Sequence, residues 1–211
     1  MLGSVGLFDS FDNLDQITVD SLIPWLKNSL SSIQLENYLD NKILYPNTLP
    51  LTEYDMKIDL AILREALRMN GFKSDLFLNI TLRKIIIPER FLHYVSDLVS
   101  LTWAFVDGLL LNNRKEEWFG DLWTVVLNSN IEKIVGSILL PEFGSTADSM
   151  NISILGKDYQ VGQGSLIKIP CQKGRCEIAY KFLEGKLLGK KESVIEVYGG
   201  ELGLMIDGRK Q

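Results

Sequence analysis

The sequence predicts an α+β protein in which a mainly helical part precedes an antiparallel, β-rich C-terminal part. Over residues 1–150 the apolar residues recur mostly at helical spacing, whereas over residues 151–211 short β-branched runs alternate with glycine. The net charge changes at the same point, from −8 over residues 1–150 to +3 over residues 151–211. We therefore expect two domains, a mainly helical one over residues 1–130 and a β-rich one over residues 131–211.

Three helices are expected before residue 71. Thr18 can cap a short helix that ends near Leu26, and Ser31 or Ser32 can cap a second helix. The third runs from Glu53 to Asn70 and has the clearest pattern. Its apolar stripe, at 4-3-4 spacing, consists of Met56, Leu60, Leu63 and Leu67.

Two further helices are expected after residue 88. Glu89 to Leu111 is apolar nearly all round, which is typical of a buried helix. Arg114 to Leu127 follows as a helix that bears Trp118 and Trp123.

The remaining segments predict strands, because they are short, apolar and rich in β-branched residues. The turn residues Gly156, Lys157 and Asp158 predict a hairpin between two of them. The expected strands are Asp75 to Ile80, Lys84 to Ile87, Ile134 to Leu140, Met150 to Leu155, Tyr159 to Val161, Leu166 to Ile169, Cys176 to Phe182, Val194 to Tyr198 and Leu202 to Ile206.

Composition excludes several classes of protein. The net charge of −5 over 211 residues argues against nucleic acid as a partner. The most apolar window, Tyr94 to Leu111, contains Asp97 and Asp107, so we expect no membrane span. The N-terminus has no basic region typical of a signal peptide, and we expect a cytoplasmic protein.

Candidate chemical groups are few. The single histidine, His93, excludes multi-histidine metal sites, and no nucleophile is identified near it, so we expect neither a metal site nor a catalytic residue. Cys171 and Cys176 flank a glycine turn. They could form a redox-active bridge helped by Lys173 and Arg175, but we favour packing or incidental thiols.

Phosphate-binding motifs are absent from the sequence in their usual forms. It contains neither a G-x-x-x-x-G-K-S/T loop nor a G-x-G-x-x-G turn. Gly3 and Gly6 are the candidate cofactor-binding residues, because closely spaced glycines let backbone amides approach an anion such as a phosphate of ATP.

Two segments resemble the glutamate mutase L family. Residues 36–53 read ENYLDNKILYPNTLPLTE and lead to IDLAILREALR at 58–68, similar to the family's N-K-x3-P-x3-P-x-S/T entry into a helix that ends A-x-x-R-x-A-x-R. Residues 197–209 read VYGGELGLMIDGR, similar to the family's closing V-x-G-G-x-L-G-L-x-x-D-A-R. Residues 164–170 also fit the family's preceding segment.

The resemblance implies a partial actin- or Hsp70-like ATPase lobe, associated with adenosylcobalamin-dependent mutases. Family members are more than twice as long, and their N-terminal half carries a phosphate loop with no equivalent here. Their Gly-Gly loop, expected to hold the nucleoside, corresponds to residues 75–82, which contain no glycine. A backbone that must approach a phosphate closely needs glycine, so we expect the nucleotide contacts to be mostly lost.

The expected function is that of a catalytically inactive, protein-binding or assembly partner. The partner implied by the resemblance is either a separately encoded N-terminal half of such an ATPase or a mutase-associated protein. One alternative is a nucleotide-binding regulator that holds ATP through Gly3 and Gly6. A thiol redox protein that uses Cys171 and Cys176 is a further alternative.

Overall fold

The computed structural model describes residues 14–26, 31–70, 82–110, 119–171 and 174–209. Over these residues it contains four α-helices and nine β-strands, which confirms the predicted α+β class. The chain forms two compact units: the helical unit, Met1–Leu78 with Glu89–Lys115, and the β unit, Asn79–Pro88 with Glu116–Gln211. The boundary expected after residue 130 falls inside the β unit.

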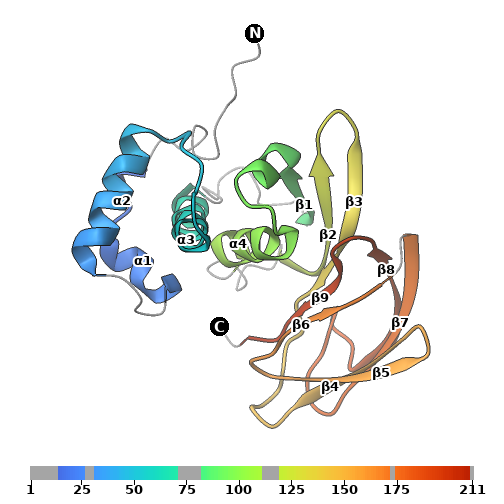
Figure 1. Ribbon diagram of the computed structural model, residues 1–211. Helices are drawn as coiled ribbons and strands as arrows, with labels where there is room; N and C mark the ends of the chain where they lie inside the picture. Colours follow the sequence, from blue (N-terminus) through green and yellow to red (C-terminus); the bar gives the residue numbers. More distant parts are fainter. Residues whose placement is uncertain (1–13, 27–30, 71–81, 111–118, 172–173, 210–211) are drawn as a thin grey trace. The chain divides into compact units, whose positions relative to one another are not determined.

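The helical unit is organised around its longest helix, α3 (Figure 1). This helix packs against α1 and α4, and Gly108 allows a close approach. A Cβ atom at Gly108 would lie 2.6 Å from the Cβ of Leu67 and 2.8 Å from the carbonyl oxygen of Arg64. The helices are α1 (Val19–Leu26), α2 (Ser32–Leu44), α3 (Glu53–Asn70) and α4 (Leu98–Leu110), with 3₁₀ turns at Leu14–Gln16 and Glu89–His93.

The ends of these helices follow local capping chemistry. Ser31 and Gln34 form a capping box at the start of α2, and Thr52 and Asp55 bond each other's backbone at the start of α3. The three helices expected before residue 71 are therefore confirmed, α3 with the predicted bounds. Among the helices that the structure describes, none is long and apolar enough to cross a membrane.

The single helix expected from Glu89 to Leu111 is wrong. The segment forms the 3₁₀ turn Glu89–His93, then a non-helical stretch, then α4. The carboxylate of Asp97 accepts the backbone N–H groups of Val99 and Ser100, both at 3.1 Å, and so starts a new helix. The apolar periodicity of the sequence continues across the non-helical stretch, so the sequence pattern did not indicate that the helix is interrupted there.

The helix expected from Arg114 to Leu127 is also wrong, because its described residues form strand β2 (Phe119–Asn128). Strand β2 pairs with β1 on one side and with β3 on the other, and residues 124–126 (Thr-Val-Val) are strongly β-forming. Trp123 is buried in the β unit, while Trp118 lies outside the described residues.

The β unit contains two sheets. The five-stranded sheet has the order β1-β2-β3-β9-β6 and is mixed, because the pairs β1–β2 and β3–β9 are parallel. The four-stranded sheet, β5-β4-β7-β8, is antiparallel throughout. The strands are β1 (Leu82–Pro88), β2 (Phe119–Asn128), β3 (Glu132–Leu139), β4 (Ser149–Ile154), β5 (Lys157–Gly162), β6 (Leu166–Ile169), β7 (Gly174–Phe182), β8 (Glu192–Gly199) and β9 (Gly203–Asp207).

The seven strands expected from residue 134 onward are confirmed as β3 to β9, each end within two residues of its predicted position. The strand expected from Lys84 to Ile87 lies within β1. The strand expected from Asp75 to Ile80 lies outside the described residues.

The two sheets meet where β8 contacts β3 and β9. The hydroxyl of Ser137 donates to the carbonyl oxygen of Tyr198 at 3.0 Å and accepts the N–H of the same residue at 2.9 Å. Gly203 has φ +74°, and a Cβ at Gly136 would collide with the Gly203 carbonyl oxygen. The lack of a side chain at Gly136 therefore lets β9 lie beside β3. The shared core beneath the sheets includes Leu139, Met150, Ile152, Ile178, Val197, Leu204 and Ile206.

Candidate functional site

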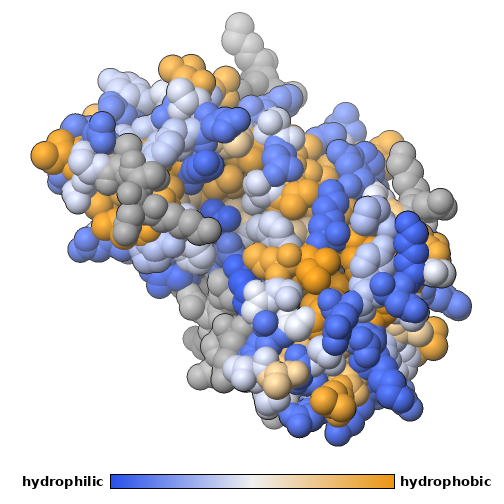
Figure 2. Space-filling view, turned by 60° about the horizontal axis from the view of Figure 1, so that its bottom comes forward, coloured by the Kyte–Doolittle hydropathy of each residue, from blue (hydrophilic) through white to orange (hydrophobic). Residues whose placement is uncertain are grey.

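An exposed apolar loop joins α2 to α3. We call residues 44–51 the α2–α3 loop. Leu44, Tyr45, Leu49 and Leu51 all expose most of their side chains, and Leu51 is 91% exposed. Large apolar residues are also exposed elsewhere in the described chain, and on the face drawn in Figure 2 orange side chains lie among blue ones. The loop differs because it places four of them within eight residues.

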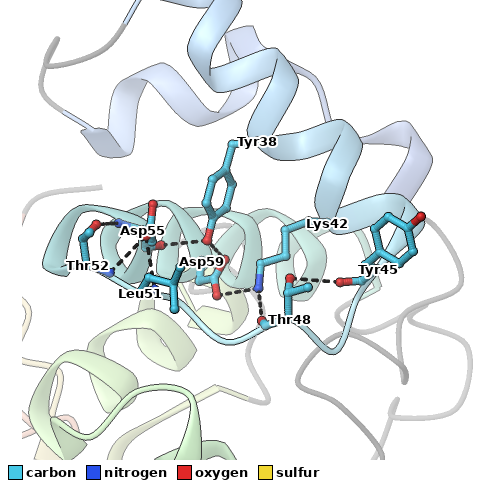
Figure 3. A network of polar contacts seen from close by, with 8 residues as sticks. All are labelled: Tyr38, Lys42, Tyr45, Thr48, Leu51, Thr52, Asp55 and Asp59. Carbon is cyan, nitrogen blue, oxygen red and sulfur yellow. Dashed lines mark hydrogen bonds and ion pairs between the residues drawn. The ribbon is translucent and has the colours of Figure 1, made fainter.

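A buried ion pair holds this loop against the helices (Figure 3). The Nζ of Lys42, near the end of α2, lies 2.8 Å from the Oδ2 of Asp59 in α3, and the two side chains are 3% and 0% exposed. The same Nζ donates to the carbonyl oxygen of Thr48 at 2.5 Å. One ammonium group therefore joins α2, α3 and the backbone of the loop.

Tyr38 completes the buried network. Its hydroxyl donates to the Oδ1 of Asp59 at 2.9 Å. Burial raises the pKa of Tyr38 well above its ordinary value, and the neighbouring carboxylate of Asp59 raises it further. Burial also raises the pKa of Asp59, against the opposing effects of Lys42 and Tyr38. The tyrosine therefore stays protonated and serves as a hydrogen-bond donor.

The second half of the loop is fixed by the start of α3. The Oδ2 of Asp55 accepts the N–H of Leu51 at 3.1 Å and that of Thr52 at 3.0 Å. In return the N–H of Asp55 donates to the hydroxyl of Thr52 at 3.0 Å. The two prolines of the loop, Pro46 and Pro50, restrict its backbone further.

The arrangement fixes a shape and provides no reactive group. Each polar side chain of the network contacts another member of the network or a backbone group of the loop. Four large apolar residues of the loop reach solvent, together with the polar residues Asn47 and Thr48. The site is therefore a candidate surface for binding another protein.

None of the predicted site residues belongs to this loop. Gly3 and Gly6 lie outside the described residues. Cys171 and Cys176 are joined by a disulfide and both are buried in the core of the β unit, so they are not separate thiols as we favoured. His93 is exposed at the end of its 3₁₀ turn. In the described part of the chain, no three His, Cys, Asp or Glu side chains gather as metal ligands would.

The buried network was not expected, although the sequence holds a signal for it. Lys42 follows Leu35 and Leu39 at i+7 and i+3, so a lysine occupies the apolar face of α2. Asp59 likewise lies on the buried side of α3, next in sequence to the core residues Ile58 and Leu60. Opposite charges on the buried faces of two consecutive helices are a reason to expect an ion pair between them.

Comparison with known proteins finds no matching family, no matching curated protein and no matching solved structure.

Proposed function

We propose that this chain is a divergent, catalytically inactive relative of actin-like ATPases that binds a protein partner in the cytoplasm through its α2–α3 loop. The observation that carries the proposal is the loop itself. Four exposed apolar side chains lie on a backbone that a buried ion pair and a helix cap hold in place.

The energetics of association favour such a surface. Burying apolar area stabilises a complex by roughly 25 cal/mol per Å². A loop that is already fixed loses little conformational entropy when it binds, so more of this free energy remains as affinity. The Lys42–Asp59 pair contributes to binding indirectly, because it fixes the loop before the partner arrives.

The family resemblance indicates which partner to test first. The loop lies inside the matched segment 36–53, and Lys42, Pro46 and Pro50 are all positions of the family pattern. The implied partner is a separately encoded N-terminal half of such an ATPase, or a protein associated with an adenosylcobalamin-dependent mutase.

The direct experiment measures binding of the purified chain to the product of the neighbouring reading frame by calorimetry. Leu51→Asp should weaken binding by about tenfold or more, because it places a charge in an apolar interface. Leu183→Asp is the matched control, since Leu183 is an exposed apolar residue of the β unit that does not belong to the loop. Equal binding by both variants would contradict the proposed surface.

A second titration addresses the nucleotide. We expect no micromolar binding of ATP by the chain, because residues 75–82 lack the glycines expected to hold the nucleoside and the sequence contains no phosphate loop of the usual form. Micromolar binding, together with nucleotide-dependent thermal stabilisation that Gly6→Arg abolishes, would favour the nucleotide-binding regulator instead.

A further inference from the structure

A pocket of about 430 Å³ opens in the helical unit between α1, α3 and α4. Its lining includes Trp25 from α1, Ser100 from α4 and four residues of α3, namely Tyr54, Lys57, Leu60 and Arg64. The volume falls within the usual range for small-molecule sites, roughly 300–1,000 Å³. None of these residues belongs to the buried network beneath the α2–α3 loop.

Arg64 is held in position at this pocket by two contacts. Its Nε donates to the Oδ2 of Asp107 at 2.7 Å, and its guanidinium carbon lies 5.4 Å from the ring centroid of Trp25. Trp25 is fixed in turn, because its Nε1 donates to the Oε1 of Glu65 at 2.8 Å. The guanidinium is therefore preorganised before any ligand binds.

The lining of the pocket carries two cations, Lys57 and Arg64, and the carboxylate of Asp97 lies close by, because it accepts the hydroxyl of the lining residue Ser100. Asp107 offsets the charge of Arg64, and Glu65 accepts from both Arg68 and Trp25. Lys57 also lines the pocket, and its ammonium makes no ion pair with any residue that the structure describes. Lys57 is therefore the lining cation without an ion pair among the described residues, and one such cation matches a monoanion better than a phosphate dianion.

Tyr54 supplies a polar atom that needs a partner. Its hydroxyl is buried and has no hydrogen-bond partner among the described residues. An unsatisfied buried hydroxyl costs about 1–3 kcal/mol, so such a group is often paired with a ligand or a water in the working protein. The apolar part of the lining, Leu60 and the ring of Trp25, suits a hydrocarbon body beside the polar groups.

We infer that this pocket binds a small organic monocarboxylate with an aromatic or aliphatic body. The carboxylate accepts hydrogen bonds from Lys57, Arg64 and the hydroxyl of Tyr54, and the hydrocarbon body lies against Leu60 and Trp25. The inference is independent of the proposed partner surface, which uses other residues.

The test uses 3-phenylpropionate as the probe, with neutral 3-phenylpropionamide and inorganic phosphate as comparisons. Calorimetry and ligand-detected NMR on the full chain should show millimolar or tighter binding of the carboxylate. The amide and phosphate should bind about tenfold more weakly, since each lacks either the charge or the hydrocarbon body. Equal binding of the amide, stronger binding of phosphate, or no binding of the carboxylate would each overturn the inference.

Two variants separate ligand binding from folding. Lys57→Gln should weaken carboxylate binding about tenfold, whereas the matched control Lys157→Gln, an exposed lysine of the β unit, should not. Tyr54→Phe should also weaken binding, yet it should leave the melting temperature of the free protein unchanged or raised, because it removes an unpaired buried hydroxyl. Unchanged binding in both variants would contradict the inference.

Discussion

The helical unit and the β unit each bury a carboxylate, and they do so in opposite ways. In the helical unit, Asp59 lies beside an ammonium and a tyrosine hydroxyl, and burial raises its pKa. In the β unit, the carboxylate of Asp148 lies among backbone N–H groups. The contrast shows that backbone donors aimed at a carboxylate can lower its pKa where burial alone would raise it.

The surroundings of Asp148 explain its behaviour. Its oxygens accept the N–H of Gly144 at 2.9 Å, that of Ser149 at 2.8 Å and that of Glu184 at 3.1 Å. Burial alone would raise the pKa of Asp148, but these bonds and one from Gly185 outweigh burial and lower it. The side chain thereby joins the turn before β4 to the turn after β7.

The largest expected effect comes from breaking the ion pair of the helical unit. Lys42→Met leaves Asp59 buried without its cation and should lower the free energy of unfolding by about 3 kcal/mol. The double variant Lys42→Met with Asp59→Leu should recover most of this loss, because no buried charge remains. Urea denaturation of the wild type and of the two variants measures both changes in the free energy of unfolding.

The matched control for this cycle is an exposed ion pair. The Nζ of Lys181 lies 3.0 Å from the Oε2 of Glu192, and the two side chains are 72% and 66% exposed. Lys181→Met should therefore change the free energy of unfolding by less than about 1 kcal/mol. A loss no larger in Lys42→Met than in Lys181→Met would show that the buried pair does not stabilise the loop.

A smaller effect is expected at Asp148. Asp148→Asn replaces one of the accepting oxygens by an NH₂ group and removes the charge, which should lower the free energy of unfolding by about 2 kcal/mol. Asp158→Asn, at an exposed residue of β5, should change it by less than about 0.5 kcal/mol. Equal losses in the two variants would show that the backbone donors around Asp148 contribute little.

The smallest effect, and the most diagnostic one, is the pH dependence. Asp148 has a folded pKa below its ordinary value of 3.8, so its contribution is present above pH 3.8 and is lost as the pH falls through the folded pKa. Asp59 has a raised folded pKa, so the native state binds more protons than the unfolded state and stability falls as the pH rises from 3.8 through that pKa.

Urea midpoints measured across this range should therefore separate the two residues. The difference between wild type and Asp148→Asn should shrink as the pH falls below 3.8. The stability of wild type relative to Asp59→Asn should instead decrease as the pH rises above that value. Parallel curves for the two variants would contradict the assigned pKa directions.

Local signals predicted much of this fold. The bounds of α3 follow from Thr52, Asp55 and a regular apolar stripe, and β6 follows from a short β-branched run. Predictions were wrong where two interpretations fit the same residues. Asp97 starts a new helix inside an unbroken apolar pattern, and the segment containing Trp123 has helical spacing but pairs with strands on both sides.

The candidate site was harder to predict because it depends on contacts between elements. Lys42 and Asp59 are 17 residues apart, and only packing brings their buried faces together. The pocket depends on Trp25 and Ser100, which tertiary structure places beside Tyr54 and Arg64. A sequence pattern on one helix cannot show which residue of another helix lies opposite it.

The position of β9 has a consequence for biosynthesis. Strand β9 lies between β3 and β6, yet it is translated after all the strands of the antiparallel sheet. Until β9 is synthesised, the edges of β3 and β6 that it covers have no partner strand. We therefore expect a chain truncated before Gly203 to aggregate more readily than the full chain, because two strand edges stay unpaired.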